Sequence, residues 1–431
     1  MKVLVIGKGG REHALCWSFA KSPNVKEVIC APGSDGIRSV ARCVPIEETE
    51  HEAIVHLVKD ELIDLVVIGP EAPLVAGLAD ELKEEGIRVF GPSKQAAQIE
   101  GSKEFAKDLM EKYEIPTGAY RVFDSLTPAI EYVKEQGAPI VVKADGLAAG
   151  KGVVVAMSEE EAVTALEQIL DEKQFGEAGA RVVIEEFLEG EECSLMAFMN
   201  GETVVPMVVA QDHKRAFDGD RGPNTGGMGA YSPVPHISKE AIKQAEQTIV
   251  RKMARALKQE NCSFTGILYA GLMMTSDGPK VIEFNARFGD PEAQVVLPRL
   301  ITPLDEVIFS VLKHEEIDVE WCEETVIGVV LASDGYPGSY DTRVPIDSSV
   351  FKQQSGPFFH AGTRELDGEW MTNGGRVGIV TGMDRSLEQA QKSVYTVLQD
   401  AQTDGLFYRS DIGSRAISAS SPSASSEGKK Q

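Results

Sequence analysis

The sequence predicts a multidomain protein of the α/β and α+β classes whose first domain is a doubly wound parallel sheet. Its 431 residues are too many for one hydrophobic core. Residues 1 to about 92 alternate short apolar runs with helical patterns, which is typical of parallel α/β units. Later apolar runs follow each other through glycine-rich turns, which predicts antiparallel hairpins.

Composition limits the classes of function. The formal net charge of −24 argues against a general binder of nucleic acid or anionic membranes, although local Lys/Arg clusters can still bind small anions. The six cysteines are scattered without a CxxC pair, which is typical of reduced thiols in a cytoplasmic protein. No apolar run reaches the roughly 18 to 20 residues that span a bilayer. We therefore expect a cytoplasmic protein with neither a nucleic-acid nor a membrane partner.

The first strand and helix meet at a glycine turn. Lys2–Ile6 is an apolar strand, and Gly7–Ala14 leads from it into a helix. This is the phosphate-binding geometry of doubly wound folds. The dinucleotide pattern GxGxxG fails because Glu12 replaces its third glycine. A site for a smaller phosphate, with Arg11 as a clamp, and a turn needed only for packing both remain open.

Three further strands are expected in this domain. Ligands of such sheets bind beyond the carboxyl ends of the strands, so Glu71 and the first glycine turn should face one cleft. The three predicted strands are Val25–Cys30, Asp64–Ile68 and Arg88–Pro92.

A helical pattern over residues 93–113 carries Lys103 and stops before Ile115-Pro116. A second helix is expected over Ala129–Gln136.

A glycine-rich hairpin follows. Pro139–Ala144 is a predicted strand that continues through a glycine loop into Val153–Val155. The loop is not a P-loop, because three residues instead of four separate Gly146 from Gly150, and Gly152 replaces the required Ser/Thr. A flexible hairpin over phosphates and a purely structural hairpin are the alternatives, and two flanking lysines favour the first. These lysines are Lys143 and Lys151.

Next come a helix over 158–171 and a strand from Arg181 that runs into the acidic link Glu185–Glu192. The chain should leave this link as a second strand, Leu195–Met199. Backbone groups of such a link can bind an adenine edge, and a following Glu can accept hydrogen bonds from ribose. Residues 206–235 are polar and glycine-rich, and a loop of this length is usually functional.

A second hairpin carries the strongest metal-binding pattern. After a helix over 238–259, strands Thr265–Met274 and Val281–Asn285 are joined by a short turn. Strand alternation predicts that Glu283 and Asn285 point to one side, with Val281 extending that face into the core. A carboxylate beside an amide oxygen suits Mg²⁺, which takes few protein ligands plus phosphate oxygens. Arg287 is placed to hold a phosphate or carboxylate.

The remaining chain predicts a helix over 303–313 and a small C-terminal α/β domain. Its strands are expected at Val326–Ala332, Phe358–Thr363 and Arg376–Thr381, with a helix over 387–401. The Ser-rich end of the chain predicts a disordered tail.

Together these features resemble the ATP-grasp ligases, which clamp ATP between two small sheets. Within them the chain resembles the glycinamide ribonucleotide synthetase (phosphoribosylamine–glycine ligase) family over nearly its whole length. The motifs that carry this resemblance are GKGGREHA (7–14), GPEAPL (69–74), KADGLAAGKG (143–152), QDHKR (211–215), GPNTGGMG (222–229) and EFNARFGDPE (283–292).

The resemblance implies that ATP, glycine and 5-phosphoribosylamine give ADP, phosphate and glycinamide ribonucleotide through glycyl phosphate, a step of purine synthesis. Another ATP-grasp carboxylate–amine ligase of purine synthesis is the alternative. Mg²⁺ is the implied metal, with Mn²⁺ as a substitute, and a monomer or weak dimer is expected.

The resemblance also implies site residues. Arg287, Lys143 and Asp290 are the implied catalytic side chains, and Glu283 and Asn285 the metal ligands. The residues implied for ATP binding are Lys103, Lys143, Gly146, Gly150, Lys151, Gly152, Glu185, Glu186, Leu188 and Glu192, with Glu191 as the alternative to Glu192 at the ribose. For the substrates they are Gly9, Gly10, Arg11, Glu71, Asp212, Lys214, Arg287 and Glu292.

The implied domains are an N-terminal domain (1–101), an ATP-grasp domain (102–325) with a mobile lid at about 121–190, a C-terminal domain (326–418) and the disordered tail (419–431). One departure concerns the metal. Many ATP-grasp enzymes have a second acidic ligand on the preceding strand of the hairpin, and Leu268–Leu272 contains no carboxylate here. Metal affinity without ATP should therefore be weak.

Overall fold

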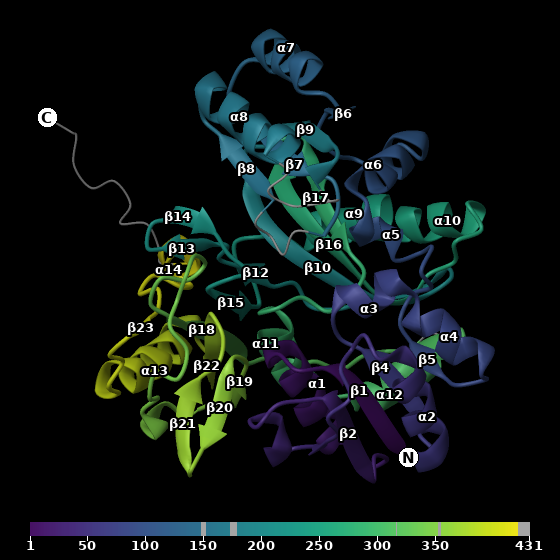
Figure 1. Ribbon diagram of the computed structural model, residues 1–431, viewed down its shortest axis with the longest axis vertical. Helices are drawn as coiled ribbons and strands as arrows, with labels where there is room; N and C mark the ends of the chain where they lie inside the picture. Colours follow the sequence, from purple (N-terminus) through teal and green to yellow (C-terminus); the bar gives the residue numbers. More distant parts are fainter. Residues whose placement is uncertain (148–151, 173–178, 316, 352–354, 421–431) are drawn as a thin grey trace, which may run out of the picture.

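The computed structural model describes residues 1–147, 152–172, 179–315, 317–351 and 355–420. The N-terminal domain and the C-terminal sheet lie at one end of the molecule, and a small sheet with α7 and α8 lies at the other (Figure 1). A long antiparallel sheet connects the two ends. The mixture of a parallel α/β sheet with antiparallel sheets confirms the expected fold class. In the described ranges, no helix has the length and apolarity needed to cross a bilayer.

The N-terminal sheet is parallel and covered on both faces. Val3 and Val5 of its central strand pack in the same cluster as helix α1 (Gly10–Ala20). Leu4 and Ile6 point to the opposite face, in a cluster shared with α2 (His51–Glu61) and α4 (Leu78–Glu84). Burial on both faces explains the continuous apolar run of the first strand. The strand order is β3 (Arg42–Cys43), β2 (Glu27–Pro32), β1 (Lys2–Gly7), β4 (Leu65–Ile68) and β5 (Val89–Phe90).

The prediction of a single helix over 93–113 is wrong. The chain forms α5 (Gln98–Gly101) and α6 (Lys103–Lys112), which are separated by Ser102 in an extended conformation. The Ser102 hydroxyl accepts a hydrogen bond from the Phe105 amide, so it caps α6. This second start places Lys103 at the first turn of a helix, against the glycine-rich hairpin.

A four-stranded antiparallel sheet forms the small sub-domain that we call the lid. Its strands, in order across the sheet, are β6 (Tyr120–Phe123), β9 (Val182–Glu186), β7 (Ile140–Ala144) and β8 (Val153–Ala156). Helices α7 (Leu126–Gln136) and α8 (Glu159–Leu166) pack with it around a separate hydrophobic core. The lid is thus a packing unit of its own.

The central sheet is also antiparallel. It consists of β11 (Thr203–Pro206), β10 (Glu191–Asn200), β16 (Thr265–Thr275) and β17 (Gly278–Asn285), with α9 (Lys239–Ala245) and α10 (Arg251–Gln259) beside it. The β16–β17 hairpin confirms the second predicted hairpin. The strand after the acidic link begins at Glu191, four residues before the predicted start at Leu195, because residues from Glu191 onward pair with β16.

The polar segment 206–235 is not one loop. It contains β12 (Gln211–Asp212), the hairpin β13 (Arg215–Phe217) and β14 (Arg221–Asn224), and β15 (Gly229–Ser232). β15 pairs with β18 (Thr325–Ser333), so this segment extends the C-terminal sheet. Sequence periodicity could not show this, because the partner strand lies about 100 residues further along the chain.

The C-terminal domain packs α13 (Leu387–Asp400) on a sheet that continues through β22 (Arg376–Asp384) to β19 (Phe358–His360). The strand expected over Phe358–Thr363 is two strands, because β20 (Thr363–Leu366) pairs separately with β21 (Glu369–Thr372). Helix α12 (Leu304–Leu312) precedes the domain, and β23 (Leu406–Phe407) follows α13. Helix α14 (Ser414–Ser420) includes the first two residues of the tail that we expected to be disordered.

Two buried histidines join the first and last domains. His13 of α1 and His360 of β19 stack with 5.6 Å between ring centroids, and the His360 amide donates to His13 Nδ1 at 2.9 Å. Burial lowers the pKa of His13 to about 3 and that of His360 to about 4. Both imidazoles are therefore neutral at pH 7.

Acidification should destabilise this interface. Histidine in the unfolded chain has a pKa of about 6.5, so below that pH the unfolded state binds protons that the folded state does not. The contribution of the two neutral histidines to the free energy of unfolding is complete above pH 6.5. It is lost as the pH falls toward their pKa values in the folded protein, about 3 and about 4. His360→Phe should lessen the loss by up to about 1.4 kcal/mol per pH unit below 6.5, measured as thermal melting between pH 7.5 and 5. His56→Phe, at a side chain that is 69% exposed, is the control. Equal pH dependence of all three proteins would contradict this role.

Candidate active site

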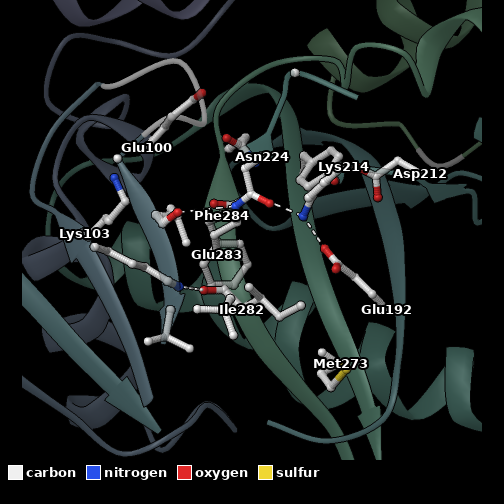
Figure 2. A pocket seen from close by; sticks show the side chains of 18 of the residues that line it. Glu100, Lys103, Glu192, Asp212, Lys214, Asn224, Met273, Ile282, Glu283 and Phe284 are labelled. Atoms are coloured by element: carbon white, nitrogen blue, oxygen red, sulfur yellow. Dashed lines mark hydrogen bonds and ion pairs between the residues drawn. The ribbon is translucent and has the colours of Figure 1, made fainter. Parts of the chain in front are cut away.

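A cavity of about 650 Å³ lies between the lid, the central sheet and the N-terminal domain. Its wall also includes Arg376 and Arg415 of the C-terminal domain. Most of the predicted site residues line this cavity, although they are spread over nearly 300 positions of the chain. Figure 2 shows the side chains of several of them converging on the hollow from both sides.

Strand β17 brings Glu283 and Asn285 to the cavity wall, as predicted. The pairing with β16 shifts register here and leaves Ile282 as an extra residue on β17. Such a β-bulge reverses the alternation of side chains. Val281 consequently packs with Phe284 in the core on the other face. The prediction that Val281 shares the face of Glu283 and Asn285 is wrong for this reason.

Glu283 is a carboxylate among ammonium groups. Burial raises its pKa, but Lys214, Lys143 and Lys103 together outweigh burial, so the pKa lies below its ordinary value. Glu283 and Asn285 offer the hard oxygens that a divalent cation prefers. Within the described ranges, no group of three or more Asp, Glu, His or Cys side chains is arranged to hold a metal. A bound Mg²⁺ would therefore need phosphate or water oxygens to complete its coordination.

Lys214 lies between two carboxylates. It forms an ion pair with Glu192, and its Nζ is 3.8 Å from Glu283 Oε1. Figure 2 shows Lys214 with Glu192 on one side and Glu283 on the other. Burial lowers the pKa of Lys214, but Glu192, Asp212 and Glu283 raise it well above its ordinary value. The ammonium is consequently held in its charged form.

Asp212 has an unsatisfied oxygen in this acidic part of the cavity. Its Oδ1 is buried and has no hydrogen-bond partner in the part of the chain that the structure describes. Burial raises the pKa of Asp212, and the carboxylates of Glu292 and Glu192 add to that rise, although Lys214 opposes it. Glu292 is itself held by Tyr269 and Ser194, whose hydroxyls donate to its Oε1 at 2.7 and 2.9 Å. A cationic ligand would satisfy Asp212.

Arg287 connects the cavity to the N-terminal domain. Its guanidinium is 2.9 Å from Glu100 Oε1 and 3.4 Å from Glu71 Oε2. Burial would lower its pKa, but Glu100 and Glu71 raise it above the ordinary value. Arg287 also donates to the Phe288 carbonyl at 3.2 Å. Glu71 and Arg287, both named for substrate binding, thus form an ion pair that the sequence did not predict, and Glu100 is a further partner of Arg287.

The glycine turn after β1 is filled by a carboxylate. Glu12 Oε2 accepts a hydrogen bond from the Gly9 amide at 2.7 Å, and Oε1 is 2.6 Å from Arg11 Nε. A Cβ added at Gly7, whose φ is +127°, would lie 2.4 Å from Glu12 Cγ. The turn therefore needs glycine partly to hold Glu12. Because this carboxylate uses the Gly9 amide, that amide is not free for a phosphate.

Arg11 lines the main cavity, whereas Gly10 lines a small neighbouring hollow. Asp290 lines both cavities. Its carboxylate is 2.8 Å from Arg376 and accepts from Gln294 at 2.7 Å. Burial raises its pKa, but Arg376 and Arg11 lower it below the ordinary value. Asp290 is thus a fixed carboxylate at the boundary with the C-terminal domain.

The lysines predicted for phosphate binding lie at the lid side of the cavity. Lys143 Nζ is 2.9 Å from Glu185 Oε1 and donates to the Ile282 carbonyl at 2.9 Å. Lys103 Nζ donates to the Gly146 carbonyl at 2.9 Å. Gly152 is also in the wall. Gly150 and Lys151 lie outside the described residues.

The acidic link between β9 and β10 also forms part of the wall, through Glu186, Leu188 and Glu192. Gly190 has a φ of +157°, and an added Cβ would lie 2.2 Å from the Met274 carbonyl oxygen. Glycine here lets the link pass close to β16. The link therefore lies across the end of the central sheet, beside the lysines.

Sequence reasoning missed several charged or polar side chains of the cavity. Lys107, Glu100, Tyr269 and Arg376 all line it, but none belongs to a motif of characteristic spacing. For Lys107 the only signal was its place on the same helical pattern as Lys103, one turn further on.

Three family models match the chain. They describe the N domain (residues 1–100), the ATP-grasp (A) domain (101–293) and the C domain (326–415) of phosphoribosylglycinamide synthetase. A phosphoribosylamine–glycine ligase of Halalkalibacterium halodurans is 59% identical over 427 residues, covering 99% of this chain and 100% of the relative.

Solved structures give the same result. The crystal structure of a phosphoribosylamine–glycine ligase from Thermotoga maritima matches with a TM-score of 0.82 and 34% identity, over 96% of this chain and 100% of that one. The biotin carboxylase domain of Hydrogenobacter thermophilus 2-oxoglutarate carboxylase matches with a TM-score of 0.71 and 16% identity, over 94% and 91% of the chains, which is a likeness of fold. The chain thus belongs to the phosphoribosylglycinamide synthetase family and has the ATP-grasp fold of its members.

Proposed function

We infer that this protein joins glycine to 5-phosphoribosylamine at the expense of ATP, releasing ADP, phosphate and glycinamide ribonucleotide. One observation carries the inference. A single cavity combines a hard-oxygen pair, Glu283 and Asn285, with several cationic side chains on one side and the unsatisfied Asp212 carboxylate on the other. The names of the relatives, phosphoribosylamine–glycine ligases, support the same reaction.

We propose that ATP binds between the lid and the central sheet. The backbone of the acidic link would contact adenine near Glu186 and Leu188, and Glu192 would accept from ribose. The carboxylate of Glu185 is already paired with lysines, so its own contact with adenine would come from the main chain. Lys103 and Lys143, with Gly146, Gly150, Lys151 and Gly152 of the hairpin, would lie along the phosphates.

The metal site would use Glu283 and Asn285, and Mn²⁺ takes the same oxygen ligands as Mg²⁺. When bound, the ion supplies charge neutralisation at the phosphate oxygens. The lysines of the chain would also neutralise charge at the phosphate oxygens. Phosphoryl transfer depends chiefly on such charge neutralisation and on alignment of the reacting groups.

We propose two chemical steps. A glycine carboxylate oxygen attacks the γ-phosphorus, the bond to the ADP oxygen breaks, and glycyl phosphate forms. The amine of phosphoribosylamine then attacks the acyl carbon, the bond from that carbon to the phosphate oxygen breaks, and the proton lost by the amine nitrogen leaves with the phosphate. Arg287 would stabilise the transferring phosphoryl group, with Glu71 and Glu100 holding its guanidinium in place.

The two substrates would be bound through groups of opposite charge, which are the ammonium of glycine and the 5-phosphate of phosphoribosylamine. Asp212 and Glu292 would receive the glycine ammonium, with Lys214 holding the neighbouring carboxylates and Asp290 close to the reacting groups. Arg11 would bind the 5-phosphate, with Gly10 and Gly9 forming the floor of that subsite. Because Glu12 uses the Gly9 amide, Arg11 is the principal phosphate contact in this proposal.

Three broader proposals follow. The first is that the protein is a monomer or at most a weak dimer. The six cysteines are free thiols, which supports a cytoplasmic setting. We also retain the domain division at 101, 325 and 418, with residues 121–190 as a lid that closes on ATP; the separate core of the lid supports this.

ADP release should depend on both co-substrates. We expect steady-state ADP formation only when Mg²⁺-ATP, glycine and phosphoribosylamine are all present. A coupled assay for ADP with each component omitted in turn checks this. If ADP forms with a different carboxylate and amine but not with this pair, the protein is another ATP-grasp ligase of purine synthesis.

Removing the Glu283 charge should abolish most turnover without unfolding the protein. Glu283→Gln should lower kcat at least ~100-fold because part of the charge clamp on the transition state is lost. Asp277→Asn, in the exposed turn of the same hairpin, is the matched control and should keep full activity. Thermal melting is measured alongside. A folded Glu283→Gln protein with near-normal turnover would exclude the metal role.

Asp212→Asn should act on glycine selectively. A charge-assisted hydrogen bond contributes about 1.5 to 3 kcal/mol, so we expect KM for glycine to rise roughly 10- to 100-fold. KM for ATP should change less than about threefold, because the charges that act on Asp212 are those of Lys214 and nearby carboxylates and not those of Lys103 and Lys143, the lysines proposed for the phosphates. Initial rates with each substrate varied in turn give both constants. An equal rise in the two KM values would point to general damage to the site.

A further inference from the structure

A buried cluster of three charges underlies the lid side of the cavity. Lys107 of α6 and Lys143 of β7 both pair with Glu185 of β9, at 2.8 and 2.9 Å. The three side chains are only 2%, 4% and 6% exposed. We call Lys107, Glu185 and Lys143 the charge triad. Lys107 lines the cavity but has no part in the proposed reaction steps.

The triad is fixed to the strand that carries the metal ligands. Lys107 donates to Thr117 Oγ1 at 2.8 Å, and Thr117 donates to the Val281 carbonyl at 2.8 Å. Lys143 donates to the adjacent Ile282 carbonyl at 2.9 Å. Both lysines are thus connected to the residues that directly precede Glu283. Movement of the triad would move β17 or break these hydrogen bonds.

The charges of the triad do not cancel. Two ammonium groups and one carboxylate leave a net charge of +1 in a region that water scarcely reaches. With Lys107 absent, Lys143 and Glu185 would form a neutral pair. A lysine ammonium has three N–H donors, and Lys143 uses two of them on Glu185 and Ile282. Among the described residues no partner is found for the third donor, which leaves it to a ligand, and its attraction for an anion depends on the uncancelled charge.

We propose that Lys107 is a positioning residue for nucleotide polyphosphate: by sharing Glu185, it leaves Lys143 with an uncancelled positive charge beside the metal strand. Lys107 itself need not touch the nucleotide. This inference rests on the proposed function only in that the cavity binds ATP.

Stability alone is a weak explanation for the triad. Burying an ion pair costs desolvation that the Coulomb attraction often fails to recover, so apolar side chains of similar size serve stability equally well. Burial accordingly lowers the pKa of Lys107, and Glu185 opposes that shift. A second buried lysine on one carboxylate adds to this cost. A net positive charge facing a site for polyphosphate is a benefit that apolar residues cannot replace.

The test is direct nucleotide binding to the full-length protein, measured by calorimetry with Mg²⁺-ADP and with AMP. Lys107→Met should weaken the affinity for ADP at least ~10-fold and the affinity for AMP less than about threefold. We expect this difference because the lost charge acts on the second phosphate of ADP, which AMP lacks. A merely structural defect would weaken both nucleotides alike. Lys112→Met is the matched control, since Lys112 is on the same helix and pairs with Glu260 at the surface. It should bind both nucleotides as the unchanged protein does.

A double variant provides the second test. Lys107→Met combined with Glu185→Gln again leaves Lys143 uncancelled, so the net charge returns to +1. ADP affinity should recover at least about threefold relative to Lys107→Met alone. Thermal melting of each variant identifies any that fails to fold, and for such a variant Lys107→Gln replaces Lys107→Met.

The outcomes separate the two proposals. If the unchanged protein binds neither nucleotide, the proposed function fails. If the unchanged protein binds ADP and Lys107→Met binds it as well as Lys112→Met does, the role of Lys107 is overturned while the proposed function stands. The same holds if Lys107→Met weakens the affinities for ADP and AMP equally. Absence of recovery in the folded double variant also overturns it.

Discussion

The structure depends on the mutual compensation of buried and partly buried charges around strand β17. Carboxylates from four different segments, Glu71, Glu100, Glu185 and Glu283, lie near this strand with their cationic partners. A buried charge that loses its partner costs several kcal/mol, so each partner constrains the position of the other. The N-terminal domain, the lid and the central sheet thus meet at the cavity through ion pairs as well as through apolar packing.

The same charges divide the cavity into two electrostatic regions. Lys103 and Lys143 make the lid side attractive to polyphosphate, whereas Asp212 and Glu292 make the opposite side attractive to an ammonium group. Lys214 lies between these regions and pairs with Glu192. Such a division can orient a zwitterion such as glycine, with its carboxylate toward the phosphates and its ammonium away from them. Orientation of this kind accounts for much of the rate of a reaction that needs alignment more than acid–base catalysis.

The C-terminal domain contributes to the site by holding a loop in place. Arg409 is 1% exposed and pairs with Asp220 and Asp411 while donating to the Arg215 carbonyl. Arg376 donates to the carbonyl of Gly226 at 2.7 Å and pairs with Asp290. These bonds hold the β13–β14 hairpin and the glycine-rich segment after it against the cavity. The domain thus shapes the substrate side without supplying any of the predicted catalytic residues.

Local sequence patterns determined much of this protein. The continuous apolar run of β1 required a strand buried on both faces, and Glu12 at the third glycine position excluded a dinucleotide turn, because its carboxylate occupies the turn. The alternation of Glu283 and Asn285 correctly predicted that both face the cavity. Six motifs in order identified the family, which the comparisons confirm. Each of these signals lies within about ten residues, where backbone geometry links sequence to structure directly.

Only the tertiary structure decided the rest. The bulge at Ile282 that separates Val281 from Glu283 depends on pairing with β16, and the strands within 206–235 depend on β18 far along the chain. The partners of Arg287 and the burial of Lys107 come from segments that no spacing rule connects. An ion pair between distant residues is chosen by the fold that desolvates both partners. For that reason the sequence predicted which residues belong to the site, and the fold decided with which partners their charges pair.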